Sequence, residues 1–109
     1  MDDLKDVLSK IIEFRDERDW EQFHNSKDLA LALSIEASEL LELFLWKKAD
    51  DVNLERLKEE LADVFMYGLL LAQKNNIDIK EIIEAKLKIN AAKYPVNKAK
   101  GRADKYNEL

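Results

Sequence analysis

Two stretches decide how this chain folds: Ile35–Glu42, with the sequence IEASELLE, and Glu59–Phe65, with the sequence EELADVF. Each stretch sets two acidic residues three positions apart in an otherwise apolar run, and this spacing places both side chains on one face of a helix. The two pairs are Glu36 with Glu39 and Glu60 with Asp63. We therefore expect two helices whose four carboxylates meet inside a helical bundle.

Four carboxylates brought together away from water repel one another and lose hydration, so they need protons, a cationic partner or a metal ion. No lysine or arginine lies within 35–42 or 59–65. A hard divalent cation with oxygen ligands is the natural occupant, and we expect Mg²⁺, with Mn²⁺ as a substitute. The rival di-iron carboxylate site needs a Glu-x-x-His motif on two helices. The only histidine, His24, falls outside the expected helices, which excludes this rival.

The composition is typical of a single helical domain. The chain has 109 residues, of which 47% are hydrophobic and 38% are charged, with only two glycines and one proline. The net charge of −5 offers no basic excess to neutralise a nucleic-acid backbone. Cysteine is absent, and no run reaches the roughly 18 apolar residues that a membrane span needs. We expect a soluble, cytoplasmic protein with no nucleic-acid partner and no membrane partner.

Apolar residues at helical spacing predict four helices, at about 4–18, 26–47, 54–74 and 79–93. Ser26 or Asp28 can cap the start of the second helix, and Asn75-Asn76 can end the third. Asp78 followed by Glu81 resembles a capping box that opens the fourth.

The second and third helices are apolar around most of their circumference, so one small chain cannot easily cover them. We expect an all-α four-helix bundle that is completed by oligomerisation, most simply a dimer across a two-fold axis. A monomer whose helices cover one another is the alternative. The bundle should occupy residues 1–95, since Pro95 ends the fourth helix, and residues 96–109 should form an extended basic tail.

The segment 19–26 breaks the helical period and carries Trp20, Phe23 and His24. Large aromatic residues in a short connection indicate that the connection packs back onto the rest of the protein. The segment is either a lid packed on the bundle or the wall of a pocket.

Two further aromatic residues follow an acid by seven positions: Trp46 after Glu39, and Tyr67 after Glu60. Seven helical residues rise about 10.5 Å, near the reach from the phosphates of a nucleotide to its base. In an antiparallel hairpin the two rings lie in opposite directions from the acids, so a shared base pocket needs a residue from a neighbouring subunit. Packing in the core or at an interface is the alternative role.

On the fourth helix, Lys86, Asn90 and Lys93 form one polar stripe. Such a stripe is usually only solvated. Facing a metal-bound polyphosphate, it would supply point charges and an amide donor.

These motifs are similar to those of the MazG-type all-α nucleoside triphosphate pyrophosphohydrolases. The two acid pairs and the Lys86-x-x-x-Asn90 spacing resemble the family in general. Resemblance to its dCTP pyrophosphatase branch rests on more specific stretches, which are Arg18–His24 (RDWEQFH), Leu45–Lys47 (LWK), Tyr94–Val96 (YPV) and Lys105–Tyr106 (KY).

The resemblance implies roles for individual residues. Magnesium is expected to bind Glu36, Glu39, Glu60 and Asp63. The nucleoside pocket is expected to consist of Trp20, Glu21, Gln22, Phe23, His24, Trp46 and Tyr67, and the phosphate contacts are expected from Lys86 and Asn90. The resemblance also implies a homo-oligomer, often a dimer of dimers. Lys93 departs from the family, where arginine is common, because lysine lacks the bidentate fork of arginine.

The expected reaction is the Mg²⁺-dependent hydrolysis of a small-molecule nucleotide, dCTP or a 5-modified dCTP, between its α and β phosphates. The products are the monophosphate and pyrophosphate. We expect the four acids to carry the catalysis, with Glu39 as general base. The alternatives are a dUTP/dUDP-type hydrolase and a non-catalytic nucleotide-binding helical adaptor.

Overall fold

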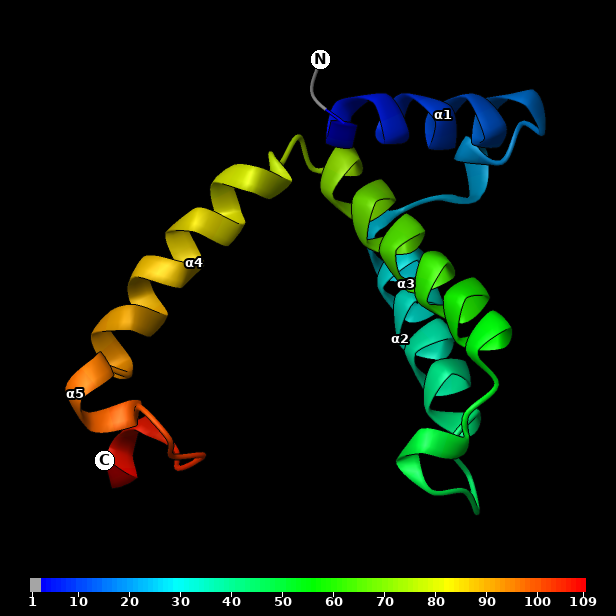
Figure 1. Cartoon of the computed structure of the whole chain (residues 1–109). Helices are drawn as coiled ribbons and strands as arrows, with labels where there is room; N and C mark the ends of the chain where they lie inside the picture. The colour runs from blue at the N-terminus through cyan, green and yellow to red at the C-terminus, as the bar shows by residue number, and fades with distance from the viewer. Residues whose placement is uncertain (1–2) are drawn as a thin grey trace. The chain divides into compact units, whose positions relative to one another are not determined.

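A computed structural model describes residues 3–109 and shows an all-α protein, as the sequence predicts (Figure 1). The α-helices are α1 (Asp3–Glu17), α2 (Ser26–Glu42), α3 (Leu54–Lys74), α4 (Ile79–Lys93) and α5 (Val96–Ala99). Three short 3₁₀ helices lie at Glu21–Phe23, Ala49–Asp51 and Tyr106–Glu108. Among the described residues, no helix has the length and apolar character that crossing a bilayer requires.

The cap of α2 differs from the prediction. Asn25 has an extended backbone, and its side-chain oxygen accepts a hydrogen bond of 2.8 Å from the backbone N–H of Asp28. Ser26 is already helical, so it cannot supply the extended conformation that an N-cap needs. The prediction of Ser26 or Asp28 as the cap was therefore wrong.

The end of α2 also differs, because the helix stops at Glu42 and not near Lys47. Hydrogen bonds between residues three apart, in place of four, tighten its last turn. The backbone N–H of Leu43 donates to the backbone oxygen of Leu40, and that of Phe44 donates to the backbone oxygen of Leu41. Trp46 then has a φ of 62°, a left-handed conformation that no helix continues. The predicted helix was too long, and Trp46 does not share a helix face with Glu39.

The predicted junction between α3 and α4 is confirmed. Asn75 is the C-cap of α3, and Asn76 follows with a φ of 55°. Asp78 caps α4, where its side chain accepts a hydrogen bond of 3.1 Å from the backbone N–H of Glu81.

The chain divides into two compact units, the first ending at Ile77 and the second spanning Asp78–Leu109. In the first unit, α2 and α3 lie side by side as a hairpin, and α1 lies at the end of the hairpin away from the 43–53 connection (Figure 1). The buried apolar residues are Ile11, Leu29, Leu43, Leu69, Leu70 and Ala72. They all belong to this unit, which therefore has a core of its own.

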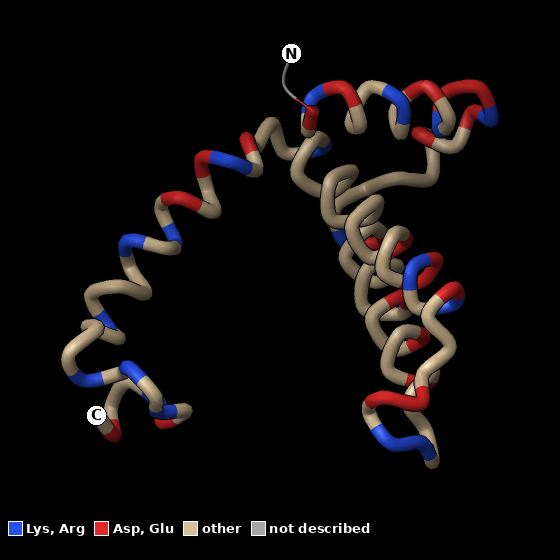
Figure 2. Tube along the Cα trace, in the orientation of Figure 1, with Lys and Arg blue, Asp and Glu red and all other residues tan. Residues whose placement is uncertain are grey.

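In the second unit, the residues after Pro95 are not extended as predicted. They form α5 and a 3₁₀ helix, and the ring of Tyr106 packs edge-on against the ring of Tyr94, with 6.2 Å between centroids. The ammonium of Lys93 lies 4.9 Å from the centroid of Tyr106. Figure 2 shows basic positions gathered in this last part of the chain, which agrees with its predicted charge. The division into a domain at 1–95 and a tail at 96–109 stays a prediction.

Candidate metal and nucleotide site

The two acid pairs meet across the α2–α3 hairpin. One carboxylate oxygen from each of Glu36, Glu60 and Asp63 lies within 4.8 Å of the others, and we call these three residues the acidic cluster. Glu39 stands one turn from Glu36 on α2 and interacts with both Glu36 and Glu60. The four acids that the sequence singles out are therefore neighbours in space.

The donor atoms of the acidic cluster suit a divalent cation. The Oε2 atoms of Glu36 and Glu60 are both buried, and neither has a hydrogen-bond partner among residues 3–109. A buried carboxylate oxygen without a partner costs free energy, and a cation bound between several such oxygens offsets this cost. Oxygen donors in this number favour a hard divalent ion. The acidic cluster can thus hold a divalent metal.

Two carboxylates of the acidic cluster, those of Glu36 and Glu60, resist ionisation. The pKa of Glu36 is raised to about 7, chiefly by burial and further by the hydrogen bond with Glu39 and the nearby charges of Glu39, Asp63 and Glu60. Burial and the neighbouring Glu39 also raise the pKa of Glu60, although the positive charge of Arg56 partly offsets this. Glu36 and Glu60 therefore have raised pKa values and hold protons more tightly than isolated glutamates do.

An aromatic cavity of about 280 Å³ adjoins the cluster on one side. Asp63 reaches it, and Trp20, His24 and Tyr67 line it together with apolar residues from α1 and α3. The Nδ1 atom of His24 is buried and has no hydrogen-bond partner among the described residues. Burial and the charge of Arg15 lower the pKa of His24, so its ring is neutral near pH 7. A neutral ring can both donate and accept a hydrogen bond.

The 19–26 segment thus forms part of a pocket wall. Its residues do not all face the cavity: Phe23 is 65% exposed, and the amide of Gln22 donates to the backbone and side-chain oxygens of Asp19. The carboxylate of Glu21 accepts a hydrogen bond of 3.3 Å from Arg15. Of the five residues predicted here as substrate contacts, Trp20 and His24 reach the cavity.

Arg15 is a residue of the site that the sequence analysis missed. Its side chain is only 6% exposed, and its guanidinium donates to Asp16, Glu21 and Gln73. Its backbone oxygen also accepts the N–H of Trp20 at 3.1 Å. The available signal was its position four residues after Ile11, on the apolar face of the first helix.

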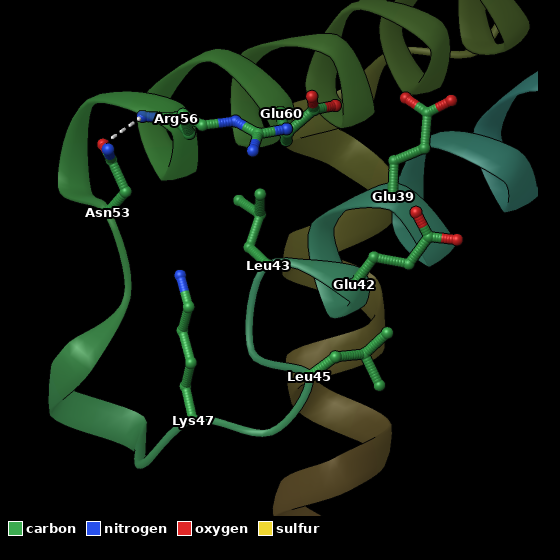
Figure 3. Close-up of a pocket in the computed structure, with 8 residues that line it drawn as sticks. All are labelled: Glu39, Glu42, Leu43, Leu45, Lys47, Asn53, Arg56 and Glu60. Atoms are coloured by element: carbon green, nitrogen blue, oxygen red, sulfur yellow. Dashed lines mark hydrogen bonds between the residues drawn. The ribbon is translucent and has the colours of Figure 1, made fainter.

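A second, mixed-charge cavity of about 500 Å³ lies toward the closed end of the hairpin (Figure 3). Its lining residues are Glu39, Glu42, Leu43, Leu45, Lys47, Asn53, Arg56 and Glu60. Asn53 caps α3 here, and its side chain accepts a hydrogen bond of 3.1 Å from the backbone N–H of Arg56. The basic side chains of this cavity were not identified from the sequence. Glu39 and Glu60 border this cavity and Asp63 borders the aromatic one, so the acids lie between the two.

Three further residues, Trp46, Lys86 and Asn90, were predicted for the site. Trp46 is fully exposed and lines neither cavity. Lys86 and Asn90 belong to α4 in the second unit, where Asn90 is half-buried and its backbone oxygen accepts the N–H of Tyr94 at 2.8 Å. The roles of these three residues stay predictions.

Comparisons with known proteins agree with this geometry. The family model described as "MazG-like family" matches residues 31–109. The chain is 39% identical to dCTP pyrophosphatase 1 of Mus musculus over 114 aligned residues, which cover 97% of this chain and 67% of the mouse protein. It is equally similar to the same enzyme of Homo sapiens, with the same coverage.

A solved structure shows the same fold. The crystal structure of a pyrophosphatase from Archaeoglobus fulgidus aligns with a TM-score of 0.79 and 36% sequence identity, and the alignment covers 87% of this chain and 94% of that one. Together with the family match over residues 31–109, this similarity identifies the chain as a member of the MazG-like family.

Proposed function

We propose that this protein is a Mg²⁺-dependent nucleoside triphosphate pyrophosphohydrolase that converts dCTP or a 5-modified dCTP to the monophosphate and pyrophosphate. One observation carries the proposal: the acidic cluster lies between an aromatic cavity and a mixed-charge cavity. A nucleotide matches this arrangement, because its base suits the aromatic cavity and its phosphates suit the acids and the mixed-charge cavity. The relatives named dCTP pyrophosphatase 1 support the choice of base.

Glu36, Glu60 and Asp63 are the residues that would hold the metal, because their oxygens lie close together and two of them lack hydrogen-bond partners. Bound there, Mg²⁺ would neutralise charge on the phosphate oxygens. Mn²⁺ prefers similar oxygen ligands and is the expected substitute.

Glu39 is our candidate for the general base. It borders the mixed-charge cavity and lies beside the cluster without belonging to it. In the proposed step, Glu39 takes a proton from a water molecule whose oxygen bonds to the α-phosphorus. The bond from that phosphorus to the bridging oxygen breaks, and its electron pair leaves with pyrophosphate.

Trp20, His24 and Tyr67 would enclose the base in the aromatic cavity. Flat rings stack on flat rings, and the free Nδ1 atom of His24 offers a polar contact to the edge of the base. We also propose that the chain forms a homo-oligomer in which Trp46 reaches the pocket of a second copy. The full exposure of Trp46, together with the exposed apolar residues Phe65 and Leu87, supports this assembly.

Pyrophosphate release from a panel of nucleoside triphosphates, with Mg²⁺ and with a chelator, tests the proposal. The expected result is fast, metal-dependent release from dCTP or its 5-modified forms. Faster release from dUTP would point to the dUTP/dUDP-type alternative. Binding of nucleotide without release from any of them would contradict the proposal and support a non-catalytic adaptor.

A further inference from the structure

Helix α3 carries four polar groups in one line. Arg56, Glu60, Asp63 and Tyr67 are spaced four, three and four residues apart, so they share one face of a continuous helix. The eleven residue steps from Arg56 to Tyr67 correspond to about 16.5 Å of helix rise. Along this face a cation comes first, then two acids, then an aromatic ring.

A second cation lies at the same end of this line. Lys47 and Arg56 line the mixed-charge cavity together with Glu60. Figure 3 shows Arg56 extending along α3 toward Glu60, and Lys47 reaching from the connection between α2 and α3 toward the same space. Within residues 3–109 neither cation forms an ion pair shorter than 4.0 Å, although the charge of Arg56 acts on Glu60. Lys58, two residues further along α3, instead pairs with Glu55 at 3.2 Å. The two cations are thus available to an anionic ligand.

We propose that Arg56 and Lys47 bind the β- and γ-phosphates of the substrate and hold the pyrophosphate as it leaves. The inference rests on the proposed function, because the direction of the nucleotide follows from placing its base in the aromatic cavity. The α-phosphate then lies at the acids, and the rest of the triphosphate extends past Glu60 toward Arg56.

The chemistry of the two side chains fits this role. A guanidinium presents a planar fork that bonds two phosphate oxygens at once, and an ammonium adds a compact point charge. The cavity of about 500 Å³ has the size of an ordinary small-molecule site. Negative charge develops on the leaving pyrophosphate during cleavage, so cations at this end stabilise the group that departs.

Equilibrium binding to the full chain in Mg²⁺ tests the proposal. The three ligands are pyrophosphate, dCMP and a dCTP analogue with a non-hydrolysable α,β-imido link, each titrated by calorimetry. Arg56→Ala should lower the affinity for the analogue and for pyrophosphate by about 10- to 100-fold, and it should leave the affinity for dCMP within about two-fold of the wild-type value. Lys47→Ala should show the same pattern with a smaller loss. Arg56→Lys should recover part of the affinity, since it keeps the charge and loses the fork.

Two matched variants control for general loss of positive charge. Lys48→Ala removes the neighbour of Lys47, and Lys58→Ala removes a lysine of α3; neither residue lines the cavity, so neither variant should change binding. Equal losses for dCMP and the analogue in Arg56→Ala, or no loss at all, would overturn the inference and leave the proposed function intact. A wild-type protein that binds neither the analogue nor dCMP would overturn both.

Discussion

Arg15 links two helices across 58 residues of sequence: its Nη1 atom donates a hydrogen bond of 3.2 Å to Oε1 of Gln73. The same guanidinium donates to Glu21 at 3.3 Å, so one buried side chain ties the end of α1 to α3 and to the pocket wall. The same residue helps to place Trp20 in the aromatic cavity, because the N–H of Trp20 bonds to the backbone oxygen of Arg15.

Replacing this arginine should weaken both the fold and the pocket. Arg15→Met keeps most of the apolar stem and removes the charged hydrogen bonds, so we expect the free energy of unfolding to fall by about 2 kcal/mol in urea denaturation. Affinity for a non-hydrolysable dCTP analogue should fall as well. Lys10→Met, at an exposed position of the same helix, is the control and should change neither. An unchanged unfolding midpoint for Arg15→Met would show that the link contributes nothing.

Removing one acid of the cluster should weaken metal binding and at the same time make the metal-free protein more stable. Glu60→Gln deletes a carboxylate that repels its neighbours, so the metal-free protein should unfold at a higher temperature than the wild type. The rise in melting temperature that Mg²⁺ produces in the wild type should disappear. Glu59→Gln changes the adjacent, exposed acid and should keep the full response to Mg²⁺. A normal Mg²⁺ response in Glu60→Gln would remove this residue from the ligand set.

The stability of the metal-free protein should depend on pH. Glu36 has a pKa of about 7 in the folded protein against an ordinary value of 4.5, chiefly because of burial. The folded state therefore keeps a proton that the unfolded chain releases. This contribution to stability is complete below pH 4.5 and is lost as the pH rises through about 7.

Thermal unfolding in a chelator at pH 5 and pH 8 measures this effect. The wild type should be more stable at pH 5, and Glu36→Gln should reduce the difference between the two pH values. Saturating Mg²⁺ should reverse the trend, because the metal binds deprotonated carboxylates. Greater stability at pH 8 in the chelator would contradict the proposed protonation of the cluster.

Two aromatic residues of the 19–26 segment should respond differently to truncation. Trp20 lines the aromatic cavity, so Trp20→Ala should weaken dCMP binding about 10-fold through lost stacking. Phe23 is exposed and lines neither cavity, so Phe23→Ala should stay near the wild-type affinity. Calorimetric titration of both variants with dCMP checks this. Equal losses would mean that the base is bound by the whole segment.

The acids could be predicted from the sequence because their position depends on two regular features. Three-residue spacing puts Glu36 beside Glu39 on any helix, and an antiparallel hairpin of the two helices brings both to the level of Glu60 and Asp63. Both features can be read from local sequence, without knowing which residues far apart in the chain pack together. The structure accordingly confirms that the pairs meet.

Other parts of the site depend on contacts that sequence spacing does not encode. The apolar run continues past Glu42, so nothing in the periodicity indicates that α2 ends there and that Trp46 turns away. In the sequence, nothing distinguishes Arg56 from any other exposed basic residue of a helix. Its role becomes visible only in the structure, where Lys47 lines the same cavity. Arg15 is buried where it bonds to Gln73, which is 58 residues away in the sequence.

The central claim is that the acidic cluster carries out metal-dependent pyrophosphate release. The most direct test is the rate of this release from dCTP in Mg²⁺ by the wild type, Asp63→Asn and Glu59→Gln, with helix content followed by circular dichroism. We predict that Asp63→Asn keeps its helices and loses turnover, whereas Glu59→Gln keeps both. Turnover by Asp63→Asn at the wild-type rate would contradict the assignment of the site.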